Sequence, residues 1–173
     1  MARFLASGYS VVETNNVAAV RTGQIKAQYP MSTALKAVGA QNGQLLTVND
    51  VAKEVGLPGS ANVMVYLHAS EERMYENHLG RNAFIVTDPN YPRMMKLSVG
   101  DIFETNAVDL GAFATIAAAQ DVATGATVGV PSTSGDIKLL ASAAGTELVV
   151  LNIVEWVTLP NGEVGIKFAV AKA

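Results

Sequence analysis

Residues 147–170 read ELVVLNIVEWVT (147–158), LPNG (159–162) and EVGIKFAV (163–170), and this stretch decides the fold. Its two outer segments are rich in β-branched and aromatic residues, a composition typical of strands. Between them, Pro160 followed by Asn161 and Gly162 is a sequence typical of a tight turn. The stretch therefore predicts a long antiparallel hairpin. Because an isolated hairpin is only marginally stable, we expect the rest of the chain to supply a sheet.

Shorter segments upstream continue this pattern of strands separated by turns. Strands are predicted at residues 62–68, 83–87, 94–98 and 102–108. Short helices are predicted at residues 49–55 and 70–75, where Asn49 and Ser70 can act as N-caps. About seven to ten short strands without a long helix predict a mainly β fold, namely a small β-barrel or β-sandwich with one or two short helices and an extended N-terminal arm.

Two segments leave alternatives open. Asn42-Gly43 suits a tight turn, which favours a hairpin between residues 34–38 and 44–48, but a helix over residues 32–38 competes with it. Residues 111–135 consist mainly of Ala, Thr, Gly and Ser, and they predict a long surface excursion.

The composition predicts one domain with either a well-filled apolar core or an apolar contact surface. The chain has 173 residues, the length of a single domain, and no cysteine, which excludes disulfides and cysteine-based sites. Hydrophobic residues make up 50% and charged residues only 16%, whereas about 25% charged residues is typical of soluble domains. The apolar excess fits a core partly built of alanine, or a surface that is buried against partner chains.

Residues 1–30 form the predicted N-terminal arm, and residues 31–173 form the single β-rich domain. The arm lacks steady helical or strand periodicity. Its apolar side chains are the candidate partner-binding residues: Phe4, Leu5, Tyr9, Val11 and Val12. If the arm becomes ordered on docking, these side chains must supply the contact energy that offsets the ordering cost. A first edge strand and loop of the same domain is the alternative interpretation.

The charge pattern argues against nucleic acid and membrane as partners. The 12 Lys and Arg residues are scattered and outnumbered by 15 Asp and Glu, whereas a phosphate-binding surface needs clustered basic residues. The longest weakly polar stretch, residues 112–119, is much shorter than the roughly 20 apolar residues that a bilayer requires. Residues 1–9 contain too short an apolar run for a signal peptide.

The sequence does not assemble a recognisable catalytic or metal motif, so we expect no enzyme activity, no cofactor and no metal. His68, Glu71, Glu72 and His78 are suitable metal ligands by type, but their spacing departs from that of zinc motifs. Neither of the phosphate-binding motifs Gly-x-Gly-x-x-Gly and Gly-x-x-x-x-Gly-Lys-Ser/Thr occurs in the sequence. The Ser-Thr-Ser-Gly segment at 132–135 lacks the Gly-x-Ser-x-Gly nucleophile elbow of hydrolases.

Several strings in the middle of the chain resemble those of small structural proteins of tailed bacteriophages. They are Asn42-Gly43-Gln44-Leu45-Leu46, Tyr66-Leu67-His68, Arg73-Met74-Tyr75-Glu76 and Leu97-Ser98-Val99-Gly100-Asp101-Ile102-Phe103-Glu104-Thr105-Asn106. The Gly-rich, Cys-free composition, with many Ala and Thr, is similar too. The resemblance implies a capsid decoration (cement) protein, a compact β-rich domain that sits on the shell and clamps neighbouring major capsid subunits.

We therefore expect a structural virion protein that is made in the host cytoplasm and located in the virion. Its expected partners are the major capsid protein or other virion proteins, and further copies of itself in a homo-oligomer. A tail-tube, head–tail connector or fibre-base subunit is the alternative within the particle. A small carbohydrate-binding module or an enzyme of unrecognised type is the alternative of another class. In that case Trp156 is the candidate sugar platform, although such a residue more often belongs to the core.

Overall fold

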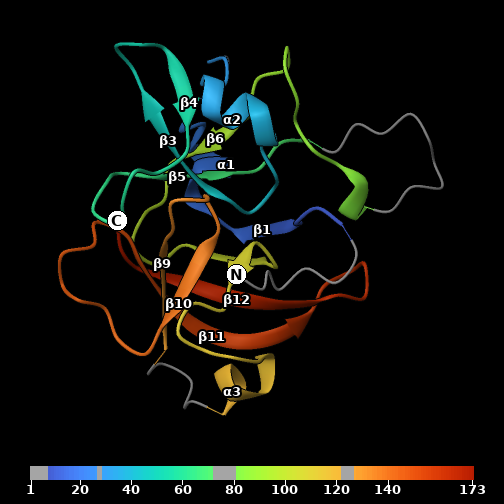
Figure 1. Cartoon of the computed structure of the whole chain (residues 1–173), viewed down its shortest axis with the longest axis vertical. Coiled ribbons are helices and arrows are strands. Elements are labelled where there is room, and N and C mark those ends of the chain that lie inside the picture. Colours follow the sequence, from blue (N-terminus) through green and yellow to red (C-terminus); the bar gives the residue numbers. More distant parts are fainter. Residues whose placement is uncertain (1–7, 27–28, 72–80, 122–126) are drawn as a thin grey trace.

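The hairpin at residues 147–170 forms as predicted and lies at the centre of the larger of two sheets (Figure 1). The computed structural model describes residues 8–26, 29–71, 81–121 and 127–173. In the hairpin, β11 (Val150–Thr158) pairs with β12 (Val164–Lys172) along its length. Strands make up 37% of the described structure and helices 12%, so the prediction of a mainly β fold is confirmed.

Five more strands complete the larger sheet in the described residues. The strand order is β1-β7-β12-β11-β9-β10-β8, and only β10 and β8 pair in parallel. The bounds are β1 (Val12–Asn16), β7 (Ile102–Thr105), β8 (Val108–Asp109), β9 (Val128–Pro131) and β10 (Ile137–Leu140). Because the described strands leave this sheet open at β1 and β8, the two sheets form a sandwich rather than a closed barrel.

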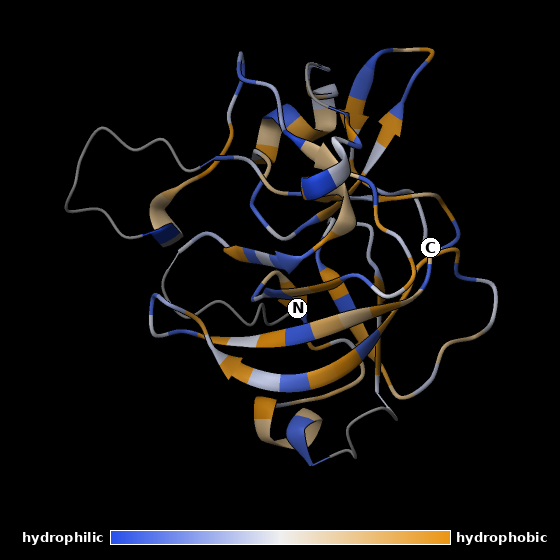
Figure 2. Cartoon of the chain, turned by 180° about the vertical axis from the view of Figure 1, so that it is seen from behind, coloured by the Kyte–Doolittle hydropathy of each residue, from blue (hydrophilic) through white to orange (hydrophobic). Residues whose placement is uncertain are grey.

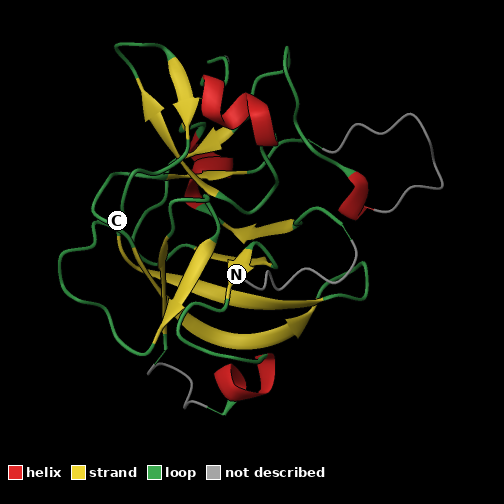
Figure 3. Ribbon diagram, viewed as in Figure 1, coloured by secondary structure: helices red, strands yellow, loops and turns green. Residues whose placement is uncertain are grey.

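The smaller sheet has the order β2-β6-β5-β3-β4 in the described residues, and all its pairs are antiparallel. The bounds are β2 (Ile25–Lys26), β3 (Leu45–Asn49), β4 (Glu54–Gly56), β5 (Tyr66–His68) and β6 (Met94–Met95). Neighbouring residues of a strand point to opposite faces of a sheet. Accordingly, Leu45 and Met95 pack into the cluster shared with the larger sheet, whereas Leu46 and Met94 pack into a second cluster with α2 (Thr33–Val38). The smaller sheet is therefore a middle layer (Figure 3).

The main core lies between the two sheets. Phe103 of β7 and Phe168 of β12 have ring centroids 5.9 Å apart, and both side chains are fully buried. Leu67 reaches the same cluster from the smaller sheet. Burying one apolar side chain of this size contributes about 1.5–3 kcal/mol to the stability of the fold. More and less buried positions alternate at residues 151–154 of β11 and 166–170 of β12, as expected for strands with one buried face, and single hydrophilic residues interrupt the hydrophobic ones (Figure 2).

The described residues contain three short α-helices, rather than the one or two predicted. They are α1 (Ala18–Thr22), α2 and α3 (Ile116–Gln120), accompanied by one 3-10 turn, η1 (Arg81–Ala83). At residues 32–38 the helix was the correct alternative, and Ser32 Oγ caps it by accepting a hydrogen bond from Leu35 N. The segment predicted as a surface excursion contains α3 and β9. Among the described residues, no helix has the length and hydropathy of a membrane span.

The helix predicted at residues 49–55 is wrong. Asn49 Oδ1 does accept hydrogen bonds from Val51 N and Ala52 N, both at 3.0 Å, so it stabilises the turn at this position. Lys53 then has a positive φ of 54°, which ends any right-handed helix, and β4 begins at Glu54. The tertiary pairing of β4 with β3 therefore outweighs the local capping signal.

Some predicted strands are shorter or paired differently. The strand at 62–68 is reduced to β5, and the strand at 83–87 is reduced to a single bridge between Val86 and Ala40. The strands predicted at 94–98 and 102–108 are neighbours in the sequence but join different sheets. β6 belongs to the smaller sheet and β7 to the larger. The helix predicted at 70–75 lies mostly outside the described residues.

The described part of the predicted N-terminal arm is integrated into the domain. Residues 12–26 form β1, α1 and β2, and β1 is the edge strand that pairs with β7. The alternative interpretation, an edge strand of the same domain, therefore describes this part of the chain, which corrects the extended arm for residues 12–26.

Candidate functional site

The five predicted contact residues do not form one exposed surface. Val11 and Val12 lie in the interior, with only 2% and 6% of their surface exposed, so they present almost nothing to a partner. Tyr9 is 38% exposed. Phe4 and Leu5 lie outside the described residues.

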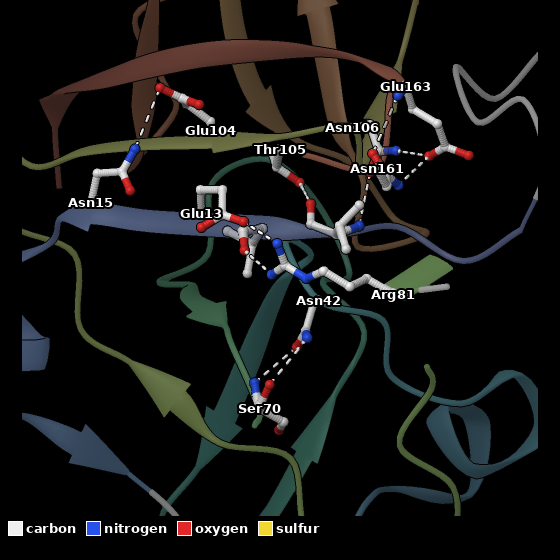
Figure 4. A network of polar contacts seen from close by, with 12 residues as sticks. Glu13, Asn15, Asn42, Ser70, Arg81, Glu104, Thr105, Asn106, Asn161 and Glu163 are labelled. Carbon is white, nitrogen blue, oxygen red and sulfur yellow. Dashed lines mark hydrogen bonds and ion pairs between the residues drawn. The ribbon is translucent and has the colours of Figure 1, made fainter. Parts of the chain in front are cut away.

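Buried polar side chains hold this N-terminal segment against the larger sheet (Figure 4). Thr105 Oγ1 donates to Val11 O at 2.7 Å, and Asn106 Oδ1 accepts from Val11 N at 2.8 Å. Asn106 Nδ2 in turn donates to Glu163 Oε2 at 2.6 Å, at the start of β12. Both partners of Val11 are fully buried. Each such bond is expensive to break, because an unpaired buried polar group costs about 1–3 kcal/mol.

Charged side chains form ion pairs on this edge strand and on its neighbours in the larger sheet. Arg81 forms an ion pair with Glu13 of β1, and its other terminal nitrogen donates to Val12 O at 3.3 Å. Glu104 of β7 pairs with Lys167 of β12 at 3.3 Å. Charges along an edge strand discourage pairing with foreign strands, which makes β1 a poor docking edge.

Residues 41–44 form a buried polar loop that connects the two sheets, and we call it the junction loop. Gln41 Oε1 accepts from Ser10 N at 3.2 Å, and Gln44 Nε2 donates to Asp136 Oδ1 at 3.3 Å in the β9–β10 turn. Asn42 bonds both the N–H and the carbonyl of Ser70, at 2.8 and 3.1 Å, as a neighbouring strand would. The Asn42-Gly43 pair singled out in the sequence therefore has an architectural role.

His68 is fully buried beside this loop, with both ring nitrogens engaged. Its Nδ1 lies 2.8 Å from Gln41 O, which can only accept, so Nδ1 carries the proton. Nε2 then accepts from Ser70 Oγ at 2.8 Å, while Ser70 Oγ accepts from Arg93 N at 3.0 Å. Burial lowers the pKa of His68 to about 4, although the bond to Gln41 opposes this shift. A neutral imidazole that makes hydrogen bonds through both ring nitrogens in this way is part of the core.

The metal-ligand types considered in the sequence are not brought together where the structure describes them. His68 is buried, Glu71 is exposed and paired with Arg93 at 3.3 Å, and Glu72 and His78 lie outside the described residues. No group of three or more His, Cys, Asp or Glu side chains suited to a metal occurs in the described part of the chain. Trp156 is half-buried and packs against the main core.

A pocket of about 290 Å³ lies beside the β9–β10 turn, in the segment that contains Ser132 and Ser134. Asp109 and Glu147, both almost fully buried, also line it. Backbone N–H groups, first that of Glu147 itself and then that of Ala144, lower the pKa of Glu147, so its carboxylate stays ionised. Its Oε2 has no hydrogen-bond partner among the described residues. The pocket therefore offers an acceptor to a polar ligand.

Exposed apolar side chains are spread over the described surface, the hairpin included, and three of them belong to segments at the end opposite the hairpin. We call Val38, Val51 and Tyr91 the apolar end; they are 57%, 95% and 55% exposed. They belong to α2, to the turn between β3 and β4, and to the loop after Val86, all of which are at the top of Figures 1 and 2, with α2 between the other two. Figure 2 shows the tip of the β3–β4 turn as hydrophobic.

Two ion pairs lie beside residues of the apolar end. Lys26 Nζ lies 2.6 Å from Asp50 Oδ2, next to Val51, and Lys36 Nζ lies 2.9 Å from Asp88 Oδ1. The hydrogen bond between Lys26 and Asp50 raises the pKa of the lysine and lowers that of the aspartate. A protein that docks here therefore meets these four charges as ion pairs, with Lys53 as a further exposed charge in the β3–β4 turn.

Sequence reasoning missed the apolar end because exposure depends on which loops the fold brings together. One signal was present: Val51 and Ala52 are apolar residues inside a turn flanked by Asp50 and Lys53, where polar residues are usual.

No protein-family model matches this chain, and no curated protein or solved structure shows significant similarity to it.

Proposed function

We propose that this chain is a structural subunit of a bacteriophage particle, specifically a capsid decoration protein that binds the major capsid shell and stabilises it. The observation that carries the proposal is the apolar end, where Val51 is 95% exposed on a projecting turn and the neighbouring Asp50 is paired with Lys26. Such a surface suits protein contact more than water. The resemblance of the middle of the chain to small phage proteins supports the same function.

The internal architecture is also compatible with a clamp. The polar side chains of the junction loop, His68 and Asn106 are engaged in holding the two sheets and the N-terminal strand together. A rigid body of this kind loses little conformational entropy on docking, so more of the contact energy becomes affinity.

Val51→Asp tests the proposal in co-sedimentation with shells of the major capsid protein from the virus whose genome encodes this chain. We expect affinity for the shells to fall by about tenfold or more, equivalent to about 1.4 kcal/mol, with an unchanged melting temperature. Val99→Asp is the matched control. Val99 is also an exposed turn valine, but its neighbour Gly100 bonds to Val170 of the larger sheet. Equal binding by both variants and the parent would contradict the proposed contact surface.

A tail-tube, connector or fibre-base subunit predicts a different result. Such a subunit forms rings or tubes with its own copies, which light scattering of the purified chain detects. Self-assembly without shell binding would favour this alternative over a decoration protein.

A second candidate function, binding of a small polar ligand such as a sugar, rests on the pocket at Glu147. Asp109, Ser132 and the unpaired Oε2 of Glu147 supply hydrogen-bonding groups there. A titration with mono- and disaccharides, monitored at the Ala144 amide that bonds Glu147, tests it. Saturable shifts that disappear in Glu147→Gln would support this function, whereas no shifts in the parent would reject it.

A further inference from the structure

The sequence contains two Asn-Gly pairs, Asn42-Gly43 and Asn161-Gly162, and the structure places them in opposite environments. Asn-Gly is the dipeptide most open to spontaneous deamidation, because glycine has no side chain to hinder attack by its nitrogen on the preceding Asn side chain. Asn42 is 2% exposed, and its amide bonds both backbone groups of Ser70. Asn161 lies in the turn at the end of the β11–β12 hairpin.

The two glycines differ in the same way. A Cβ on Gly43 would overlap Thr105 Oγ1, so this glycine is packed tightly against β7. Nothing lies within 4 Å of the corresponding position on Gly162. The N–H of Gly162 donates to Leu159 O at 2.8 Å, so attack requires this turn to open briefly. Because nothing lies beside Gly162, movement of this glycine meets no side chain, whereas movement of Gly43 disturbs the buried junction loop.

Asn161 is also connected to the N-terminal strand through two further residues (Figure 4). Asn161 Nδ2 donates to Glu163 Oε2 at 3.1 Å, and Asn106 Nδ2 donates to the same oxygen at 2.6 Å. Asn106 Oδ1 accepts from Val11 N at 2.8 Å, next to β1. Glu163 Oε2 therefore accepts a hydrogen bond from each of the two Asn side chains.

We infer that Asn161 is a site of spontaneous deamidation, and that the aspartate or isoaspartate formed there loosens β1 through Glu163 and Asn106. The Gly162 nitrogen attacks Cγ of Asn161 and forms a C–N bond. The bond from Cγ to the side-chain nitrogen breaks, and ammonia leaves with the proton from Gly162. Water then opens the cyclic imide at either carbonyl, which gives aspartate or isoaspartate.

The product changes the electrostatics around Glu163. A side-chain donor at residue 161 is replaced by a carboxylate beside the carboxylate of Glu163, and like charges at hydrogen-bond distance repel. Displacement of Glu163 removes the acceptor of Asn106, which is fully buried and cannot turn to water instead. The hold of Asn106 on Val11 weakens as a result.

Peptide mass spectrometry of the full chain during incubation at mildly alkaline pH tests the modification. We expect the deamidated fraction to rise at Asn161 about tenfold faster than at Asn42, because local opening of the turn is less costly than opening of the core. In urea-unfolded protein the two sites should react at similar rates. Equal rates in the folded protein, or no reaction at Asn161 while the unfolded chain reacts there, would overturn the assignment.

Asn161→Asp tests the coupling to β1 without waiting for the reaction. We expect the Val11 amide to exchange its hydrogen about tenfold faster than in the parent, which corresponds to a local opening free energy lower by about 1.4 kcal/mol. Asn90→Asp is the matched control, because it adds the same charge at an exposed loop position. Unchanged protection of Val11 in Asn161→Asp would overturn the coupling.

Discussion

His68 shows how burial changes the behaviour of a single residue. In water a histidine titrates near neutral pH, but here the ring is enclosed and hydrogen-bonded to Gln41 O and Ser70 Oγ. The same imidazole that is a candidate metal ligand in the sequence becomes a neutral structural group in the fold. Its remaining influence is on how stability depends on pH.

We expect the free energy of unfolding to fall as the pH drops from 6.5 to about 4. The folded-state pKa of His68 is about 4, below the unfolded value of 6.5, so the unfolded chain takes up the proton first. The stabilisation is complete above pH 6.5 and is lost by about pH 4, a change on the order of 3 kcal/mol. Urea denaturation across this range measures it.

His68→Gln is the variant that isolates this contribution. Its unfolding free energy should lack the slope between pH 6.5 and 4, although it is less stable at pH 7. Glu147, whose pKa is lowered, loses its contribution only as the pH falls below its ordinary value of 4.5, so it leaves the upper part of the window unaffected. An unchanged slope in His68→Gln would show that another group causes it.

Gly43 is the position where a single methyl group should be least tolerated. Its φ is +88°, and an added Cβ would overlap Thr105 Oγ1. We expect Gly43→Ala to destabilise the protein by about 3 kcal/mol or more, since backbone strain and overpacking add. Gly59→Ala is the control, because Gly59 has open space and no positive φ, and its effect should stay within about 0.5 kcal/mol. Similar melting temperatures for the two variants would contradict this.

At the scale of elements, β1 is held by side chains as much as by its strand partner. Thr105 Oγ1 donates to Val11 O and accepts from Ala107 N at 3.0 Å, so one hydroxyl satisfies two buried backbone groups. Thr105→Val keeps the shape of the side chain but leaves both groups unpaired. We expect a loss of about 1–3 kcal/mol in unfolding free energy from denaturant titration.

Thr158→Val is the control for Thr105→Val. Thr158 is an exposed residue of β11, where valine is a good strand former, so this change should be neutral or slightly stabilising. Equal stability of the two variants would mean that the Thr105 hydroxyl does not hold β1.

The burial of Val12 in the main core implies that deletion of the residues up to and including Val12 lowers the melting temperature of the protein.

At the scale of the whole molecule, we expect the two sheets to unfold together. Leu45 and Leu46 are consecutive residues of β3, yet they belong to the two different hydrophobic clusters. The junction loop also ties the smaller sheet to the β9–β10 turn through Gln44 and Asp136. Scanning calorimetry should therefore give one transition with equal calorimetric and van't Hoff enthalpies. Two resolved transitions would show that the sheets are independent.

Patterns of neighbouring residues were enough to predict the mainly β class and the β11–β12 hairpin with its turn at Asn161-Gly162, whereas at residues 32–38 they left a helix and a hairpin strand as alternatives. Only the tertiary structure decided that β6 and β7 join different sheets, that residues 12–16 form a strand, that His68 is buried, and that Val51 is exposed. The physical reason is that strand pairing and burial depend on groups far apart in the chain. Val11, for example, is hydrogen-bonded to Thr105 and Asn106, which lie more than ninety residues away in the sequence. No local pattern encodes such a contact.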